Sequence, residues 1–218
     1  MKIVIMVFVG IMLLVSQLLQ AQGTPYLSSL DQAPTGSFAV GNDSWLATDF
    51  FTGTNAEGYL LDSVQLALTN ASGSPSSFTA MIYSVVFTSG AVPGTNLATL
   101  TGSLSPISAG IYTYAPGSGL TLSPNTLYYL VLTAGTTVAN GAYEWDWVYP
   151  STSYNPNGNW EGGGYEFRSS SGSLGSWGHL GEYYPQYAIT ATAIPEPGVL
   201  GLLGLGGLCL LWHRRKAT

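Results

Sequence analysis

The sequence predicts an all-β protein: a single antiparallel β-sandwich, jelly-roll-like in strand number, flanked by an N-terminal signal helix and a short C-terminal transmembrane helix. Three observations predict this arrangement. Short apolar runs recur between turn-forming clusters from residue 24 to residue 193. No stretch of ten residues in that region repeats its apolar positions with helical spacing. A further apolar run stands at each end, which divides the chain into residues 1–23, 24–193 and 194–218.

The first 23 residues have the order of a secretory signal peptide. Lys2 supplies a positive charge, residues 3–15 form a nearly unbroken apolar run, and residues 16–23 are more polar. We expect cleavage after Gly23, with cleavage after Ala21 as the alternative, and therefore an export translocon and a signal peptidase as partners. An uncleaved N-terminal anchor is the other interpretation of the same run.

The middle of the chain has strand-like patterns throughout. Residues 60–68 alternate between apolar and polar side chains, and residues 78–87 are rich in β-branched and aromatic ones. Residues 127–132 are the most apolar run and are expected at the centre of a sheet, and residues 143–148 alternate aromatic with acidic side chains. Weaker strands are expected at residues 46–51, 97–100, 111–114, 165–168 and 186–192.

Turn-forming clusters separate these runs. Gly, Pro, Asn and Ser gather at residues 70–75, 92–95, 115–119 and 123–125. Eight to ten short strands with regular turn signals are typical of a β-sandwich, and the jelly roll is one such arrangement.

Charge and cysteine content exclude several function classes. Residues 24–194 contain ten acidic residues and one basic residue, Arg168, which gives a net charge of −9. A nucleic-acid-binding domain needs a basic surface, so nucleic acid is excluded as a partner. The chain has one cysteine, Cys209, and it lies in the C-terminal apolar run, so the region before residue 194 cannot form a disulfide.

The C-terminal tail has three parts in a fixed order. Pro195, Glu196 and Pro197 come first, the predicted transmembrane segment 198–212 follows, and the basic residues Arg214, Arg215 and Lys216 come last. The uncharged run 199–212 has 14 residues, whereas a comfortable membrane-spanning helix needs about 20. The basic cluster is expected to stay on the cytoplasmic side as a membrane stop, which places the rest of the chain outside.

This order resembles the PEP-CTERM sorting signal of bacterial proteins. The resemblance covers about residues 194–216 and rests on Pro195, Glu196, Pro197, the Gly/Leu-rich run and the basic end. It implies processing by an exosortase, a membrane enzyme of transpeptidase type. It also implies an intermediate anchored in the inner membrane and a final place in the cell envelope or outside the cell. The alternatives are an ordinary tail anchor and a buried apolar helix.

The passenger between signal and tail is similar to the choice-of-anchor R domain over roughly residues 37–193. The resemblance implies an extracellular β domain and supplies no catalytic motif. It rests on residues 48–52, 61–66, 78–83, 93–100, 119–132 and 143–146.

Catalytic signals are weak. Glu144 and Asp146 stand two apart on a predicted strand, roughly 7 Å from each other, a spacing that a glycosidase tolerates. Any strand with acids on its solvated face shows the same spacing, so we expect a solvated face and no enzyme. No nucleophile elbow, phosphate loop or metalloprotease motif is present, and His179 is the passenger's single histidine. No cofactor is expected; a structural calcium ion at Asn42, Asp43 or Asp49 has no motif spacing behind it.

Aromatic side chains offer the one candidate binding surface. Trp145 and Trp147 share a strand face opposite the two acids and are expected to fill the core. Trp160 and Trp177 stand in Gly/Ser-rich segments, so we expect them to be exposed and able to stack on sugar rings. The sequence thus predicts an exported, non-enzymatic structural or adhesive protein. The alternatives are a module that binds exopolysaccharide and, less favoured, a polysaccharide hydrolase.

Overall fold

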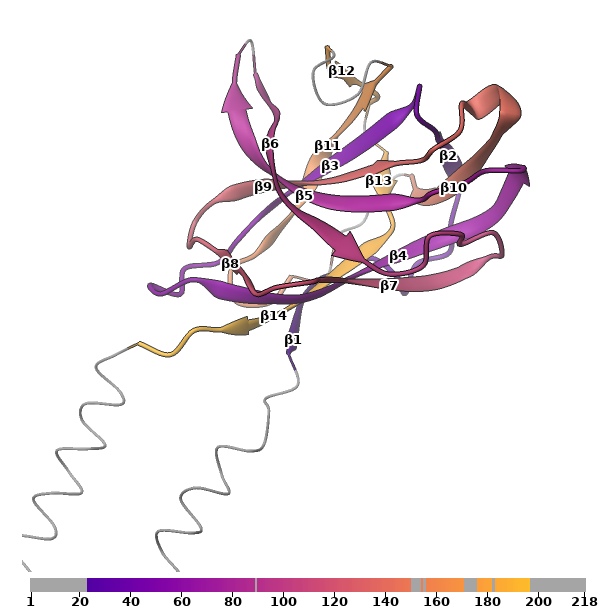
Figure 1. The fold of residues 1–218 in the computed structure, drawn as a ribbon. Coiled ribbons are helices and arrows are strands. Elements are labelled where there is room, and N and C mark those ends of the chain that lie inside the picture. The colour runs from indigo at the N-terminus through magenta and orange to yellow at the C-terminus, as the bar shows by residue number, and fades with distance from the viewer. Residues whose placement is uncertain are drawn as a thin grey trace, which may run out of the picture.

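A computed structural model describes residues 23–88, 90–149, 154, 156–170, 176–181 and 183–196, with the backbone alone for 164–168. Their strands form one continuous and nearly closed antiparallel sheet (Figure 1). The all-β, antiparallel class predicted from the sequence is thereby confirmed. The signal helix, apart from Gly23, and the transmembrane segment 198–212 lie outside the described residues.

Fourteen strands and one 3₁₀ turn make up the described chain. Within it, no helix has the length and apolar character needed to cross a membrane. In order the elements are β1 (Thr24–Ser28), β2 (Gly36–Val40), β3 (Trp45–Phe51), β4 (Tyr59–Gly73), β5 (Thr79–Phe87), β6 (Ala91–Thr101), β7 (Gly110–Pro116), β8 (Leu120–Leu122), β9 (Leu127–Thr133), η1 (Val138–Asn140), β10 (Gly141–Val148), β11 (Glu161–Ser169), β12 (Gly178–His179), β13 (Tyr184–Pro185) and β14 (Tyr187–Ala193).

The long strand β4 organises one half of the sheet. On one edge it pairs with β14 and then with β10, and on its other edge with β8 and β7. β1 pairs with β14, while β2 and β13 pair with β10. Each strand of this half is therefore held by a neighbour that is distant in sequence.

The other half runs in the order β6-β5-β9-β3-β11-β12. It is joined to the first half through β6 and β7, where Leu100 lies opposite Pro116 and Thr101 opposite Ala115. The two halves face each other (Figure 1), and the main core lies between them. β9 pairs with β3 on one edge and with β5 on the other, which confirms the central position expected from its apolar sequence. Its side chains are buried on both faces of the sheet.

The core has two parts. The main cluster takes alternate side chains from both halves, such as Leu66 of β4 and Leu130 of β9, both fully buried. A second, smaller cluster covers the outer face of β3, β5 and β9. It comprises Ala47, Met81, Tyr83, Tyr129 and Val131, with Trp45, Val85 and Trp177 packed against it.

All nine predicted strands are present, and five strands were not predicted. The five are β1, β2, β8, β12 and β13, each five residues or shorter. A strand of two to five residues carries too little alternation to be recognised from its own sequence. The expected number of eight to ten strands was therefore too low.

The turn expected at residues 92–95 was wrong. These residues belong to β6, where Pro93 lies opposite Val85 and the pairing register shifts nearby. An irregular register accommodates a proline that lacks an N–H. The Ser84 side chain stabilises the irregularity, because its Oγ accepts a hydrogen bond from the Thr95 N–H at 3.0 Å.

Candidate functional site

Both ends of the described chain lie at one end of the molecule. Thr24, the first residue of β1, is paired with Ala191, close to the end of β14. Figure 1 shows β1 beginning and β14 ending on the same side. We call this end the terminal pole; it consists of Gly23 and Thr24, residues 193–196, and the loop 52–58 between β3 and β4.

The end of β14 is fastened to the loop 52–58. Ala193 pairs with Tyr59, and the Ile194 N–H donates to the Gly58 carbonyl at 3.0 Å. The Asn55 side chain completes the attachment. Its Nδ2 donates to the Gly58 carbonyl at 2.6 Å and to the Ile194 carbonyl at 3.0 Å. Ile194 therefore has both of its backbone polar groups held by the domain.

The loop itself has a defined shape. The Gly58 N–H donates to the Asn55 carbonyl at 2.8 Å, and Gly58 has a φ of +79°, which favours glycine. A side chain at position 58 would also collide with the Leu122 carbonyl. The buried Thr52 joins the loop to the turn before β9, because its Oγ donates to the Ser123 carbonyl at 2.7 Å.

Trp160 is buried beneath this loop, and the prediction of an exposed Trp160 was wrong. Its side chain is 1% exposed and stacks on Tyr26, with ring centroids 4.9 Å apart. The edge of Tyr59 meets its ring at 5.0 Å. Tyr59 in turn accepts the Asn55 N–H at 3.1 Å through its hydroxyl oxygen. The glycine-rich sequence after Trp160 lets the backbone approach β3 and does not expose the ring. A side chain at Gly163, three residues further along the chain, would collide with Asp49.

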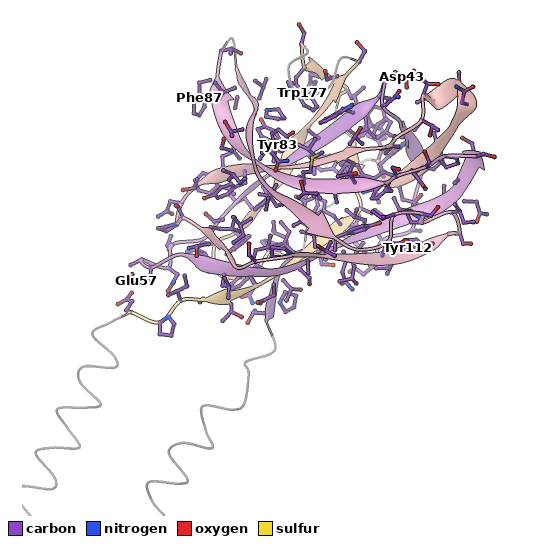
Figure 2. The ribbon with its side chains drawn as sticks, viewed as in Figure 1. Asp43, Glu57, Tyr83, Phe87, Tyr112 and Trp177 are labelled. Carbon is purple, nitrogen blue, oxygen red and sulfur yellow. The ribbon has the colours of Figure 1, made fainter. Side chains whose placement is uncertain are left out.

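Trp177 is half-buried rather than exposed. It packs against the second core cluster, and Figure 2 shows it near Tyr83. Its indole N–H is buried and has no hydrogen-bond partner within the described part of the chain. The predicted pair of sugar-stacking tryptophans, Trp160 and Trp177, is therefore not an exposed surface.

The predicted sorting residues fall at the terminal pole as far as they are described. Pro195 and Glu196 are exposed and follow the fastened Ile194 directly. Figure 2 shows Glu57 of the loop 52–58 at the place where the described chain ends. Pro197, Arg214, Arg215 and Lys216 lie outside the described residues.

Glu144 and Asp146 lie on β10 between β2 and β4, and they have different surroundings. Both oxygens of Glu144 accept hydroxyl groups: Oε2 from Ser37 at 2.9 Å and Oε1 from Ser72 at 3.4 Å. Asp146 is only 8% exposed. Burial, and secondarily the nearby Glu144 charge, raises the pKa of Asp146 to about 6. The expectation of a solvated face was therefore wrong for Asp146.

Trp145 fills the core as expected, whereas Trp147 does so only in part. Trp145 is 1% exposed and donates its indole N–H to the Gln186 carbonyl at 3.0 Å. Trp147 is half-buried and lies 4.7 Å from Tyr183, centroid to centroid. Tyr183 also lies 5.7 Å from Tyr149, whose side chain is 52% exposed. These three rings form an aromatic group at the end of β10 that the sequence analysis did not single out.

The calcium candidates do not converge. Asp43 is exposed and its Oδ1 accepts the Val138 N–H at 2.8 Å. Asp49 is buried on β3, and its carbonyl accepts the Tyr187 hydroxyl at 3.1 Å. Among the described residues, no three His, Cys, Asp or Glu side chains gather as a metal site would need. His179 lies in β12, opposite Phe167 of β11.

Comparison with known families finds one match, the PEP-CTERM protein-sorting motif, over residues 193–216. The match implies that the protein is exported and sorted through an exosortase. No curated protein matches the chain. The resemblance of the passenger to the choice-of-anchor R domain has no support from these comparisons. The match begins at Ala193, the last residue of β14, so the motif and the folded domain meet at the terminal pole.

Proposed function

We propose that this chain is an exported, non-enzymatic protein of the cell surface or extracellular matrix. In this proposal the signal peptide 1–23 is removed, and residues 24–193 are the passenger. The tail 194–218 holds the protein in the inner membrane until an exosortase processes it. The two facing halves of the sheet act as the layers of a jelly-roll-like β-sandwich, a rigid body with a neutral or acidic surface.

One observation carries this proposal. The residues that match the sorting motif begin where the folded domain ends, and Pro195 and Glu196 are exposed. Two prolines around Glu196 keep the chain extended there, because proline restricts its own φ and disfavours a helical conformation in the preceding residue. An extended, accessible acidic motif beside a folded domain is a suitable substrate for a processing enzyme in the membrane.

The test compares four forms of the full chain in its native host: wild type, deletion of residues 195–216, Glu196→Gln and, as a matched control, Asp43→Asn. Asp43 is an exposed acid on the side away from Glu57 in Figure 2. We expect the wild type and Asp43→Asn to lose the tail, as measured by intact mass. Glu196→Gln should keep the tail and stay in the membrane fraction, and the deletion form should be soluble. A wild-type protein that keeps its full tail would contradict the proposal.

The lack of an enzymatic role is supported by the state of the two carboxylates on β10. The carboxylate of Glu144 accepts hydrogen bonds from two serine hydroxyls, and the side chain of Asp146 is buried. Both carboxylates are therefore engaged within the fold, which favours a structural role. We expect no hydrolysis when the wild type is incubated with a panel of polysaccharides. Hydrolysis that Glu144→Gln abolishes would contradict the structural interpretation.

A second candidate function is glycan binding through the ring group of Trp147, Tyr149 and Tyr183. The exposed ring of Tyr149, backed by Tyr183, favours it, because sugar rings stack on exposed aromatic faces. Tyr149→Ala should weaken binding to the host exopolysaccharide in a co-sedimentation assay. The matched control is Phe87→Ala at the tip of the β5–β6 hairpin, 77% exposed and outside the ring group (Figure 2). Equal binding by both variants would remove this candidate.

A further inference from the structure

The junction between domain and tail has no spacer. β14 is paired up to Ala193, and Ile194 is held at its N–H and at its carbonyl. The Pro-Glu-Pro residues of the sorting motif start at the next residue, Pro195. An enzyme that takes Glu196 into its active site must therefore approach within a few residues of the terminal pole.

One side chain, that of Asn55, adds to the backbone contacts that hold the last residue of the domain. The Asn55 amide donates to the Gly58 and Ile194 carbonyls, and so joins the loop 52–58 to the last residue of the domain. The loop cannot swing freely, because Thr52 and Gly53 are tied to the turn before β9 by Thr52 Oγ to Ser123 and by the Asn125 N–H to the Gly53 carbonyl at 2.9 Å. Tyr59, packed on Trp160, holds the Asn55 N–H. A continuous set of contacts thus links the core to Ile194.

We propose that Asn55 is a positioning residue for tail processing: it holds Ile194 so that Pro195 and Glu196 enter the membrane-embedded processing enzyme in a fixed orientation. The inference rests on the proposed function and adds to it a role for the passenger domain. Fixing a segment before it binds lowers the entropy lost on binding, so the enzyme captures the motif more readily. The folded domain is then part of the substrate, and the motif alone is a poorer one.

The first test measures processing by the full chain in its native host. A pulse of labelled protein is followed by intact mass, and the rate of conversion from the tailed to the processed form is recorded. Asn55→Asp keeps the shape of the side chain but removes its N–H donors, and Asn55→Ala removes the side chain. We expect both to slow conversion about three- to tenfold, the effect of one or two groups that must be ordered on binding.

The matched control is Asn42→Ala. The Asn42 amide also donates to a backbone carbonyl, that of Gly135, at 3.3 Å, but this bond joins the β2–β3 and β9–β10 connections, outside the terminal pole. We expect it to be processed at the wild-type rate. Thermal unfolding of each variant separates loss of positioning from loss of stability, because processing is compared well below the lowest melting temperature.

A spacer distinguishes positioning from any general effect of the substitution. Six Gly/Ser residues inserted between Ile194 and Pro195 disconnect the motif from Asn55. We expect the spacer alone to slow conversion, and Asn55→Ala to have no further effect in the spacer background. Equal rates for wild type and Asn55→Ala, or an undiminished effect of Asn55→Ala with the spacer present, would overturn the proposal. Failure of the wild type to lose its tail would instead overturn the proposed function.

Discussion

At the scale of single residues, Trp160 shows how local composition misleads. It stands among Asn and Gly residues, which predicted an exposed ring. In the folded protein the rings of Tyr26 and Phe50 stack with its ring system, and Tyr59 makes an edge contact with it. Those partners come from β1, β3 and β4, so no window of sequence around Trp160 contains them. Its environment depends on tertiary pairing rather than on its neighbours along the chain.

Replacing Trp160 should therefore destabilise the domain strongly. Trp160→Ala is expected to lower the free energy of unfolding by about 3–5 kcal/mol, because it removes a large buried ring and leaves a cavity. Denaturant unfolding followed by tyrosine fluorescence measures this change. Phe87→Ala, at an exposed ring, should stay within about 0.5 kcal/mol of the wild type. A small effect at Trp160 would contradict the burial of its ring.

Asp146 gives a pH dependence with a defined sign. Its folded-state pKa of about 6 lies above the ordinary value of 3.8, so the folded protein binds more protons than the unfolded chain between these two values. The contribution of this residue to the free energy of unfolding is therefore favourable at low pH. It falls as pH rises from about 4 to about 6 and stays low above that range.

Asp146→Asn should remove that fall. Relative to the wild type, the variant is expected to gain stability on the order of 2 kcal/mol between pH 4 and pH 7. Urea unfolding at several pH values measures the gain. Asp43→Asn, which removes one charge at an exposed site, should keep the wild-type slope over this range. A wild-type and an Asp146→Asn profile of the same shape would show that Asp146 does not titrate in this window.

At the scale of elements, the long strands could be predicted from the sequence, whereas the residues at which they end could not. Alternation located β4 at residues 60–68, yet the strand continues to Gly73 because Ser72 and Gly73 pair with Ala142 and Gly141 of β10. The same pairing accommodates Gly73 at a φ of +59°. Turn-forming residues thus extend a strand when a distant partner is available, and only the tertiary structure supplies that partner.

The conformation of the loop 52–58 depends on Gly58, so a substitution at this position should also weaken the attachment of Ile194. Gly58→Ala is expected to cost about 1–3 kcal/mol, because the backbone has a positive φ and the new methyl group meets the Leu122 carbonyl. Hydrogen exchange at the Ile194 amide should accelerate, since its acceptor is the Gly58 carbonyl. Gly90→Ala is the matched control, because a methyl group at position 90 meets no atom within 4 Å. Unchanged exchange at Ile194 in Gly58→Ala would contradict the described hydrogen bond.

At the scale of the whole molecule, the sequence predicted the class and the sorting motif but not the closure of the sheet. Alternating patterns identify strands individually, whereas the order in which they pair depends on contacts such as β1 with β14, at opposite ends of the passenger. The candidate site was predictable in part for the same reason. Pro195 and Glu196 were found from their local motif, while Asn55, nearly 140 residues earlier, carries no local signal of its contact with Ile194.

The shared location of the two chain ends also determines how the protein responds to mechanical force. β1 and β14 are antiparallel neighbours, so tension applied between Thr24 and Ile194 acts at one end of the pair. It breaks the hydrogen bonds between the two strands one after another. Tension between Ile194 and Ser74 acts along β14 and β4 in opposite directions and loads their hydrogen bonds together. Single-molecule pulling should therefore give a lower rupture force for the first attachment than for the second. A protein that is tethered through its C-terminal end and pulled at the opposite end of β4 would therefore resist the higher force.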